Sequence, residues 1–298
     1  MIKSTQRRGG SLIGRIFFWI AVALVLFFFL FPLYWLIITS FKFTGEVTML
    51  PPTLIPWVQF QPTPKNYVEI MTKIPGGLAG TQTYTQSEFP MALLNSTLIS
   101  GATTIIAVLL GTLAAYAFSR FRIPGEGDLL FFILSTRMLP PVVGLVPLFV
   151  MFTSLKWRNT FHGITLLYVT AGLPFVVWMM KGFFDEIPKE YEEAAMIDGY
   201  SRLEAVLKIV IPEAVPAMLA TAVFVLITAW NEFVMVQLLN PDKFTTVPPF
   251  LYAIIGYGRV EWGRMAATSV VFLAPIVLFT WLVRNHLLRG VTFGAVRR

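Results

Sequence analysis

Six long apolar stretches constrain this 298-residue chain more than any other feature of its sequence. Each stretch is almost free of charge and approaches the roughly 20 residues that an α-helix needs to cross about 30 Å of hydrocarbon. Open sheet edges cannot be satisfied in lipid, and the alternating pattern of outer-membrane strands is missing, so each stretch is expected to be helical. The sequence therefore predicts an all-α integral membrane fold. Its six transmembrane helices are expected at residues 16–41, 89–119, 129–155, 163–180, 214–231 and 265–283.

The composition agrees with a membrane protein and excludes several other classes. Hydrophobic residues make up 56% of the chain, charged residues only 13%, and the mean hydropathy is +0.71. The net charge of +7 comes from Lys and Arg scattered between the apolar stretches, so no nucleic-acid partner is predicted. With no cysteine and two histidines, the sequence favours neither a thiolate nor a histidine metal centre.

The distribution of basic residues predicts the orientation. With the N-terminus in the cytoplasm, the inner segments hold 14 Lys and Arg residues and the outer segments hold 8. This bias favours both termini inside the cell. The first outer segment, about residues 42–88, is rich in Pro, Thr and Gln and is expected to pack on the outer face or to meet a partner there. Four prolines predict kinks in the third and fourth helices: Pro140, Pro141, Pro147 and Pro174.

The inner connection between the fourth and fifth helices is unusually acidic. Residues 185–204 carry seven acids and two bases, whereas cytoplasmic segments normally carry excess Lys and Arg. Pro188 suits the first turn of a helix, and Gly199 would end it. The S-x-x-E pattern at 201–204 is a capping box that starts a second helix, which is predicted to end at or before Pro212. On charge alone, a solvated loop is favoured over a helix that docks on a cytoplasmic protein.

A longer pattern reverses that preference. The loop contains Glu193-Ala194-Ala195, then Gly199, then I-V-I-P at 209–212. This arrangement resembles the EAA loop of ABC-importer permeases. The pattern of that loop is E-A-A, three residues, G, nine residues and I-x-L-P. Only Ile211 departs from it, where leucine is usual, and this change conserves volume. Residues 182–188, 230–233 and 289–296 are similar to the carbohydrate-importer branch, and within it to the second permease of the maltose-transporter type. The resemblance extends over about residues 90–298.

This resemblance implies a type I importer permease in a bacterial inner membrane. Its partners would be a second homologous permease, two cytoplasmic ATPase subunits that bind ATP and Mg²⁺, an extracytoplasmic solute-binding protein, membrane lipid and a sugar-like substrate. The chain itself would hold no catalytic residue and no cofactor. The short helix at 188–198 would dock in the ATPase, with Gly199 setting a left-handed bend at which a side chain would cost about 1 to 2 kcal/mol. The implied coupling residues are Glu190, Glu193, Ala194, Ala195, Asp198 and Gly199.

The resemblance and the hydropathy pattern together suggest three segments. Residues 1–88 form the cytoplasmic N-terminus, the first helix and the long outer loop. Residues 89–288 form a permease core of five helices that contains the coupling loop at 185–212. Residues 289–298 form a cytoplasmic tail.

Four polar residues are candidates for the solute pathway: Arg137, Asn95, Asn231 and Glu232. Arg137 lies inside the third predicted helix, where a charge is a functional candidate by default. It could donate hydrogen bonds to sugar hydroxyls, or it could pair with carbonyls that Pro140 and Pro141 free. For Asn231 and Glu232, helix capping or a contact with the partner permease is favoured over solute contact. The small polar groups around Asn95 are of a kind that more often joins helices than contacts a solute.

Three other functions remain open at this stage. The same kind of importer could carry a polyol, glycerol phosphate or another solute such as a peptide. A membrane-embedded enzyme is disfavoured because the acids of the loop lack metal-ligand spacing. An ion-driven transporter is disfavoured because no acid occupies the centre of a predicted helix.

Overall fold

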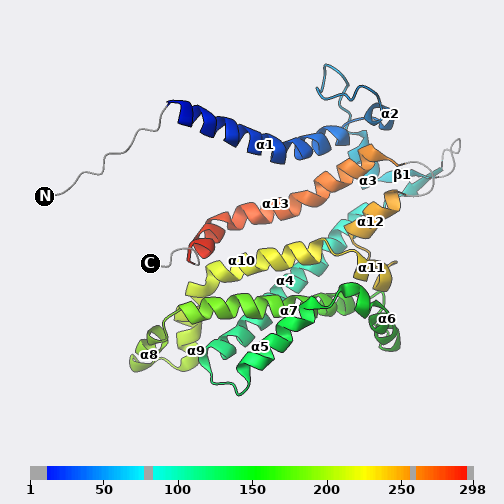
Figure 1. The fold of residues 1–298 in the computed structure, drawn as a ribbon. Helices are drawn as coiled ribbons and strands as arrows, with labels where there is room; N and C mark the ends of the chain where they lie inside the picture. The colour runs from blue at the N-terminus through cyan, green and yellow to red at the C-terminus, as the bar shows by residue number, and fades with distance from the viewer. Residues whose placement is uncertain (1–11, 77–82, 256–259, 294–298) are drawn as a thin grey trace. The chain divides into compact units, whose positions relative to one another are not determined.

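The computed structural model describes residues 12–76, 83–255 and 260–293 and is helical almost throughout (Figure 1). The chain divides into two compact units. One unit joins residues 1–86 to residues 258–270, and the other joins 87–257 to 271–298. The three-part division predicted above, at residues 88 and 288, stays a prediction.

The first unit is built around the end of α1 (Leu12–Ser40). The buried Asn66 amide donates to the backbone oxygens of Ser40, at 2.9 Å, and Lys42, at 2.8 Å. A Cβ added at Gly263 would lie only 2.6 Å from the Asn66 side chain, so the glycine permits the close approach of these two residues. The unit also contains α2 (Thr44–Val47), α3 (Lys65–Met71), an antiparallel hairpin of β1 (Lys73–Gly76) and β2 (Thr83–Gln86), and the start of α13 (Trp262–Phe293).

Three long helices form the core of the second unit, α4 (Phe89–Arg120), α7 (Phe161–Glu186) and α10 (Ile211–Trp230). Figure 1 shows them side by side. A Cβ added at Gly111 of α4 would overlap a methyl carbon of Val176 on α7, so the close packing requires glycine. Shorter helices surround the core: α5 (Glu126–Ser135), α6 (Leu145–Ser154), α8 (Glu190–Ile197), α9 (Arg202–Ala205), α11 (Val234–Leu239) and α12 (Val247–Ile254).

Hydropathy predicted five of the spans well. Helices long and apolar enough to cross a membrane occur at Leu12–Ser40, Phe89–Arg120, Phe161–Glu186, Arg202–Trp230 and Trp262–Arg284. The third predicted span, a kinked helix over 129–155, is broken more sharply than a kink, although the two pieces together are long and apolar enough to form a sixth span. In its place α5 and α6 are joined through the 3₁₀ turns η1 (Thr136–Met138) and η2 (Pro141–Gly144), with a bend of 87°.

Adjacent prolines explain this break. Pro140 and Pro141 remove two successive backbone donors, and the residue before each proline is driven toward extended geometry. Leu139 and Pro140 are both extended, with ψ of 123° and 131°. Pro174, by contrast, lies inside a helix that continues to Glu186. Tandem prolines therefore break the third span, whereas the single proline in α7 is accommodated.

The second helix of the acidic loop also differs from the prediction, because it does not end before Pro212. After α9 a π-helical turn, η3 (Val206–Val210), leads directly into α10. The Ile211 N–H donates to the Val206 oxygen, five residues earlier. This wide turn places Pro212 in the first turn of the next helical segment, where its missing donor is tolerated.

Candidate coupling helix and solute cavity

The acidic loop presents a short helix, α8, with most of its predicted coupling residues facing outward. Five of the six are exposed, and only Ala195 is buried, at 3% exposure. The exposed residues are Glu190, Glu193, Ala194, Asp198 and Gly199. Ile197, on the same helix, is 86% exposed. The exposed surface of α8 thus combines carboxylates with a large apolar side chain.

The local geometry that ends this helix agrees with the sequence prediction. Gly199 has a φ of +94°, the left-handed conformation expected there. The Tyr200 N–H donates to the Ala195 oxygen at 3.1 Å and closes the end of the helix. Ser201 and Glu204 form the predicted capping box, with the Ser201 N–H 2.9 Å from the Glu204 carboxylate. The bend between α8 and α9 is therefore fixed by backbone geometry and two reciprocal hydrogen bonds.

A buried ion pair, missed in the sequence analysis, attaches α8 to the long helices. Arg120, the last residue of α4, contacts the Glu192 carboxylate, and the two side chains are 4% and 8% exposed. The Tyr116 hydroxyl donates to the same carboxylate at 2.7 Å. Arg120 also donates to the backbone oxygens of Phe184 (2.8 Å) and Ile187 (3.0 Å) at the end of α7. One guanidinium thus joins α4, α7 and α8.

Part of the signal for this pair was present in the sequence. Arg120 closes a span, and Glu192 directly precedes the E-A-A triplet. What the sequence did not indicate is which of the seven acids turns inward, because the pair joins residues 72 positions apart.

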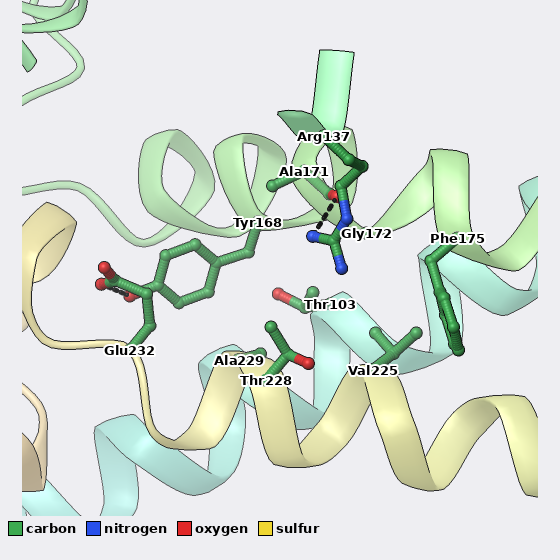
Figure 2. A pocket seen from close by; sticks show the side chains of 10 residues that line it. All are labelled: Thr103, Arg137, Tyr168, Ala171, Gly172, Phe175, Val225, Thr228, Ala229 and Glu232. Atoms are coloured by element: carbon green, nitrogen blue, oxygen red, sulfur yellow. Dashed lines mark hydrogen bonds between the residues drawn. The ribbon is translucent and has the colours of Figure 1, made fainter. Parts of the chain in front are cut away.

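A small cavity of about 60 Å³, lined by apolar and polar side chains, lies on a different part of the second unit. Arg137 reaches it from η1, Thr103 from α4 and Tyr168 from α7, while Thr228 and Glu232 line it at the end of α10 (Figure 2). The break in the third span therefore brings the predicted pathway residues Arg137 and Glu232 to one cavity.

Arg137 and Glu232 are held in different ways. An Arg137 Nη donates to the Ala171 oxygen at 3.0 Å, so its carbonyl partner comes from α7 and not from the Pro140–Pro141 break. Glu232 accepts from the Tyr168 hydroxyl at 2.7 Å and from the backbone N–H of Met235 at 3.0 Å. It thus caps α11, in agreement with the favoured sequence interpretation.

The other two pathway candidates do not line this cavity. The buried Asn95 amide donates to the backbone oxygens of Lys243 (3.3 Å) and Thr245 (3.0 Å), which ties α4 to the loop before α12. Asn231 ends α10 and donates to the Ile227 oxygen at 2.8 Å. Solute contact by either residue stays a prediction. Within the described ranges, no cluster of three or more His, Asp or Glu side chains is placed to hold a metal ion.

Comparison with known families decides what kind of protein carries these features. Residues 107–289, more than half of the chain, match the family described as binding-protein-dependent transport system inner membrane component. The chain belongs to this family. Membership assigns it to the multi-pass inner-membrane permeases of importers and favours that class over an ion-driven transporter or a membrane enzyme.

Two relatives are similar over nearly the whole chain. The trehalose/maltose transport system permease protein MalG of Thermococcus litoralis is 32% identical over 289 residues, covering 96% of this chain and 98% of the relative. The inner membrane ABC transporter permease protein YcjP of Escherichia coli is 33% identical over 288 residues, covering 96% and 97%. Over nearly its whole length this permease is therefore similar to ABC-transporter permeases, one of which is named for trehalose and maltose transport.

A solved structure shares the fold. A chain of a bacterial ABC transporter involved in the import of the acidic polysaccharide alginate aligns with a TM-score of 0.72, covering 96% of this permease and 99% of that chain. The identity is 20%. The architecture is therefore that of a type I ABC importer permease.

Proposed function

We propose that this permease forms half of the pathway through which an ATP-driven importer carries a sugar or sugar-like solute. The observation that carries the proposal is the 32% identity, over 96% of the chain, to a permease named for trehalose and maltose transport. A second homologous permease would complete the pathway, and an extracytoplasmic binding protein would deliver the solute. Two cytoplasmic ATPase subunits would bind ATP and Mg²⁺, so that this chain itself performs no catalysis. Polyols and glycerol phosphate are the alternative solutes.

Helix α8 is proposed as the contact with the ATPase. Its exposed Glu190, Glu193 and Asp198 carry negative charge, and Ile197 offers apolar area that a cleft with a basic rim would bury. This complementarity supports the docking role that the E-A-A pattern implies. The same assignment puts both chain termini in the cytoplasm, as the excess of Lys and Arg on that side favours.

The buried attachment of α8 supports a mechanical role for this contact. Because Arg120 joins α8 to the ends of α4 and α7, a displacement of the docked helix would move both long helices together. ATP binding would then close the ATPase pair and open the pathway outward, and hydrolysis would reset it. Coupling of this kind requires that the ATPase bind the two permease conformations with different affinity.

Partner content tests the first part of the proposal. The tagged chain would be purified from its native membrane in a mild detergent and its companions identified by mass spectrometry. A second permease and an ATPase are expected at the size of the complex. A stable protein without partners would contradict the importer assignment.

Substitutions on the loop test the coupling role. Glu193→Lys reverses an exposed charge on α8, and Gly199→Pro is incompatible with the φ of +94° at the bend. Both are expected to abolish uptake while the protein still inserts into the membrane. Asp128→Lys is the matched control, because it reverses an exposed acid in the first turn of α5, outside the loop. Wild-type uptake by both loop variants would refute the coupling role.

A further inference from the structure

The connection between α2 and α3 exposes an unusual number of large apolar side chains. Residues 47–64 contain no charged residue, although they lie outside the helices that are long and apolar enough to cross a membrane. Five large apolar side chains between residues 49 and 58 are 51% to 92% exposed: Met49, Leu50, Ile55, Trp57 and Val58. Exposed apolar surface of this extent marks contact with a membrane or with another protein.

This connection folds back along the last turns of α1 (Figure 1). The Tyr34 hydroxyl of α1 donates to the backbone oxygen of Leu54. The buried Lys42 ammonium donates to the backbone oxygen of Thr53, and its Nζ lies 4.9 Å from the centre of the Trp35 ring. These contacts lie within one compact unit and fix the level of the connection along α1.

The position of Tyr34 and Trp35 along α1 then sets the depth in the bilayer. The charge-free part of α1 begins after Arg15. About 30 Å of hydrocarbon corresponds to roughly 20 helical residues, so the hydrocarbon that begins there ends near Trp35. Tyr and Trp are enriched at this boundary. Leu54, which is bonded to Tyr34, therefore lies at the membrane–water boundary and not far out in the solvent.

The backbone of the connection is also suited to this boundary, because its tip pairs several of its own polar groups. The Gln59 side chain accepts from the N–H groups of Leu54 and Ile55, the second at 3.0 Å. The Trp57 N–H donates to the Phe60 oxygen at 2.8 Å and holds Trp57 at a φ of +60°, which residues other than glycine rarely adopt. Unpaired backbone groups are costly near lipid, so this pairing lowers the cost of approaching it.

We infer that residues 49–58 form a membrane-interface anchor, whose apolar side chains enter the lipid leaflet at the C-terminal end of α1. The occupant of this surface is the bilayer itself, because the segment continues the apolar surface of α1 at the level of the lipid headgroups. Trp57 suits this place, since its ring is apolar and its N–H can bond to lipid oxygens. The anchor would hold the first unit against the membrane. It requires only that α1 spans the bilayer, so it is independent of the solute and of the ATPase.

Spin labelling tests the anchor directly. The chain contains no cysteine, so Val58→Cys introduces a single thiol for a nitroxide label. The full chain, with the partners that purify with it, is placed in vesicles of phosphatidylethanolamine and phosphatidylglycerol. Power saturation then measures collisions of the label with oxygen, which concentrates in lipid, and with a neutral nickel chelate, which stays in water. Val68→Cys is the matched control, because this valine of α3 is also exposed, at 56%, but lies outside the uncharged segment.

The anchor predicts an oxygen-to-nickel collision ratio that is several-fold higher at position 58 than at position 68. Adding Trp57→Glu should lower the ratio at position 58, because a charge is disfavoured in lipid. Frequent collisions with nickel at position 58, as at position 68, would place the segment in water and overturn the inference. Few collisions with either reagent would show that a protein covers the segment, which also overturns it. An unchanged ratio after Trp57→Glu would do the same. None of these readouts depends on transport or on finding an ATPase.

Discussion

Removing the Arg120 side chain is expected to be the most damaging single truncation at the coupling loop. Arg120→Met keeps most of the side-chain volume but leaves the Glu192 carboxylate buried, with Tyr116 as its remaining partner. Breaking a buried ion pair by removing one member typically costs about 3 to 5 kcal/mol. For a unit of about 200 residues this corresponds to a fall in the thermal midpoint of roughly 6 to 20 °C.

Thermal unfolding of the purified complex measures this effect. Glu192→Gln removes the carboxylate charge and leaves the buried Arg120 guanidinium without a counter-ion. A smaller loss than for Arg120→Met is expected, because the amide oxygen can still accept hydrogen bonds from Tyr116 and Arg120. The double variant should be more stable than the sum of the two losses predicts, since the partners interact directly. Lys208→Met is the matched control: its pair with Glu204, at 3.3 Å, is 57% and 48% exposed, and pairs of this kind contribute about 0 to 1 kcal/mol.

A clear result would refute this reasoning. If Arg120→Met and Lys208→Met lowered the midpoint equally, the buried pair would not hold α8 in place. If Arg120→Met unfolded at a lower temperature but kept normal uptake per folded complex, the pair would stabilise the loop without transmitting its movement.

Three further variants test other parts of the structure. Gly111→Ala should lower the free energy of unfolding by about 1 to 3 kcal/mol, because the added methyl overlaps α7. Gly101→Ala, which has open space around it, should leave that free energy unchanged. Equal thermal midpoints for the two variants would contradict the close packing. Thr103→Val should leave the thermal midpoint unchanged or raise it, because an unpartnered buried hydroxyl is removed; a lower midpoint would point to a structural hydrogen bond. Burial lowers the pKa of the Lys42 ammonium below its ordinary 10.5, so the folded state binds fewer protons than the unfolded state. The free energy of unfolding should therefore rise with pH as 10.5 is approached. Lys42→Met should abolish this rise, measured as the thermal midpoint at each pH.

The sequence alone determined the membrane class and the approximate place of five spans. This succeeded because hydrocarbon requires a long apolar helix wherever the chain crosses it, whatever the helix packs against. Local signals were equally reliable in the loop. Gly199 and the capping box at 201–204 act through backbone groups within a few residues, so their geometry follows from the residues themselves.

The errors arose where two local rules competed. Hydropathy predicted a helix over 129–155, and its prolines were expected to kink it. The structure shows a break with a bend of 87°, because two adjacent backbone donors are lost. At Pro212 the proline rule predicted an end, but a π turn accommodated the ring and the helix continued.

Only the tertiary structure decided which polar residues meet. The pair of Arg120 and Glu192 joins residues 72 positions apart, and the cavity brings Thr103 and Arg137 together from separate elements. Lipid exposure sets the pattern of a single helix, but the pairing of polar side chains depends on how several helices pack. That packing depends on close contacts such as the one between Gly111 and α7. No single segment of the sequence identifies the partner of such a contact.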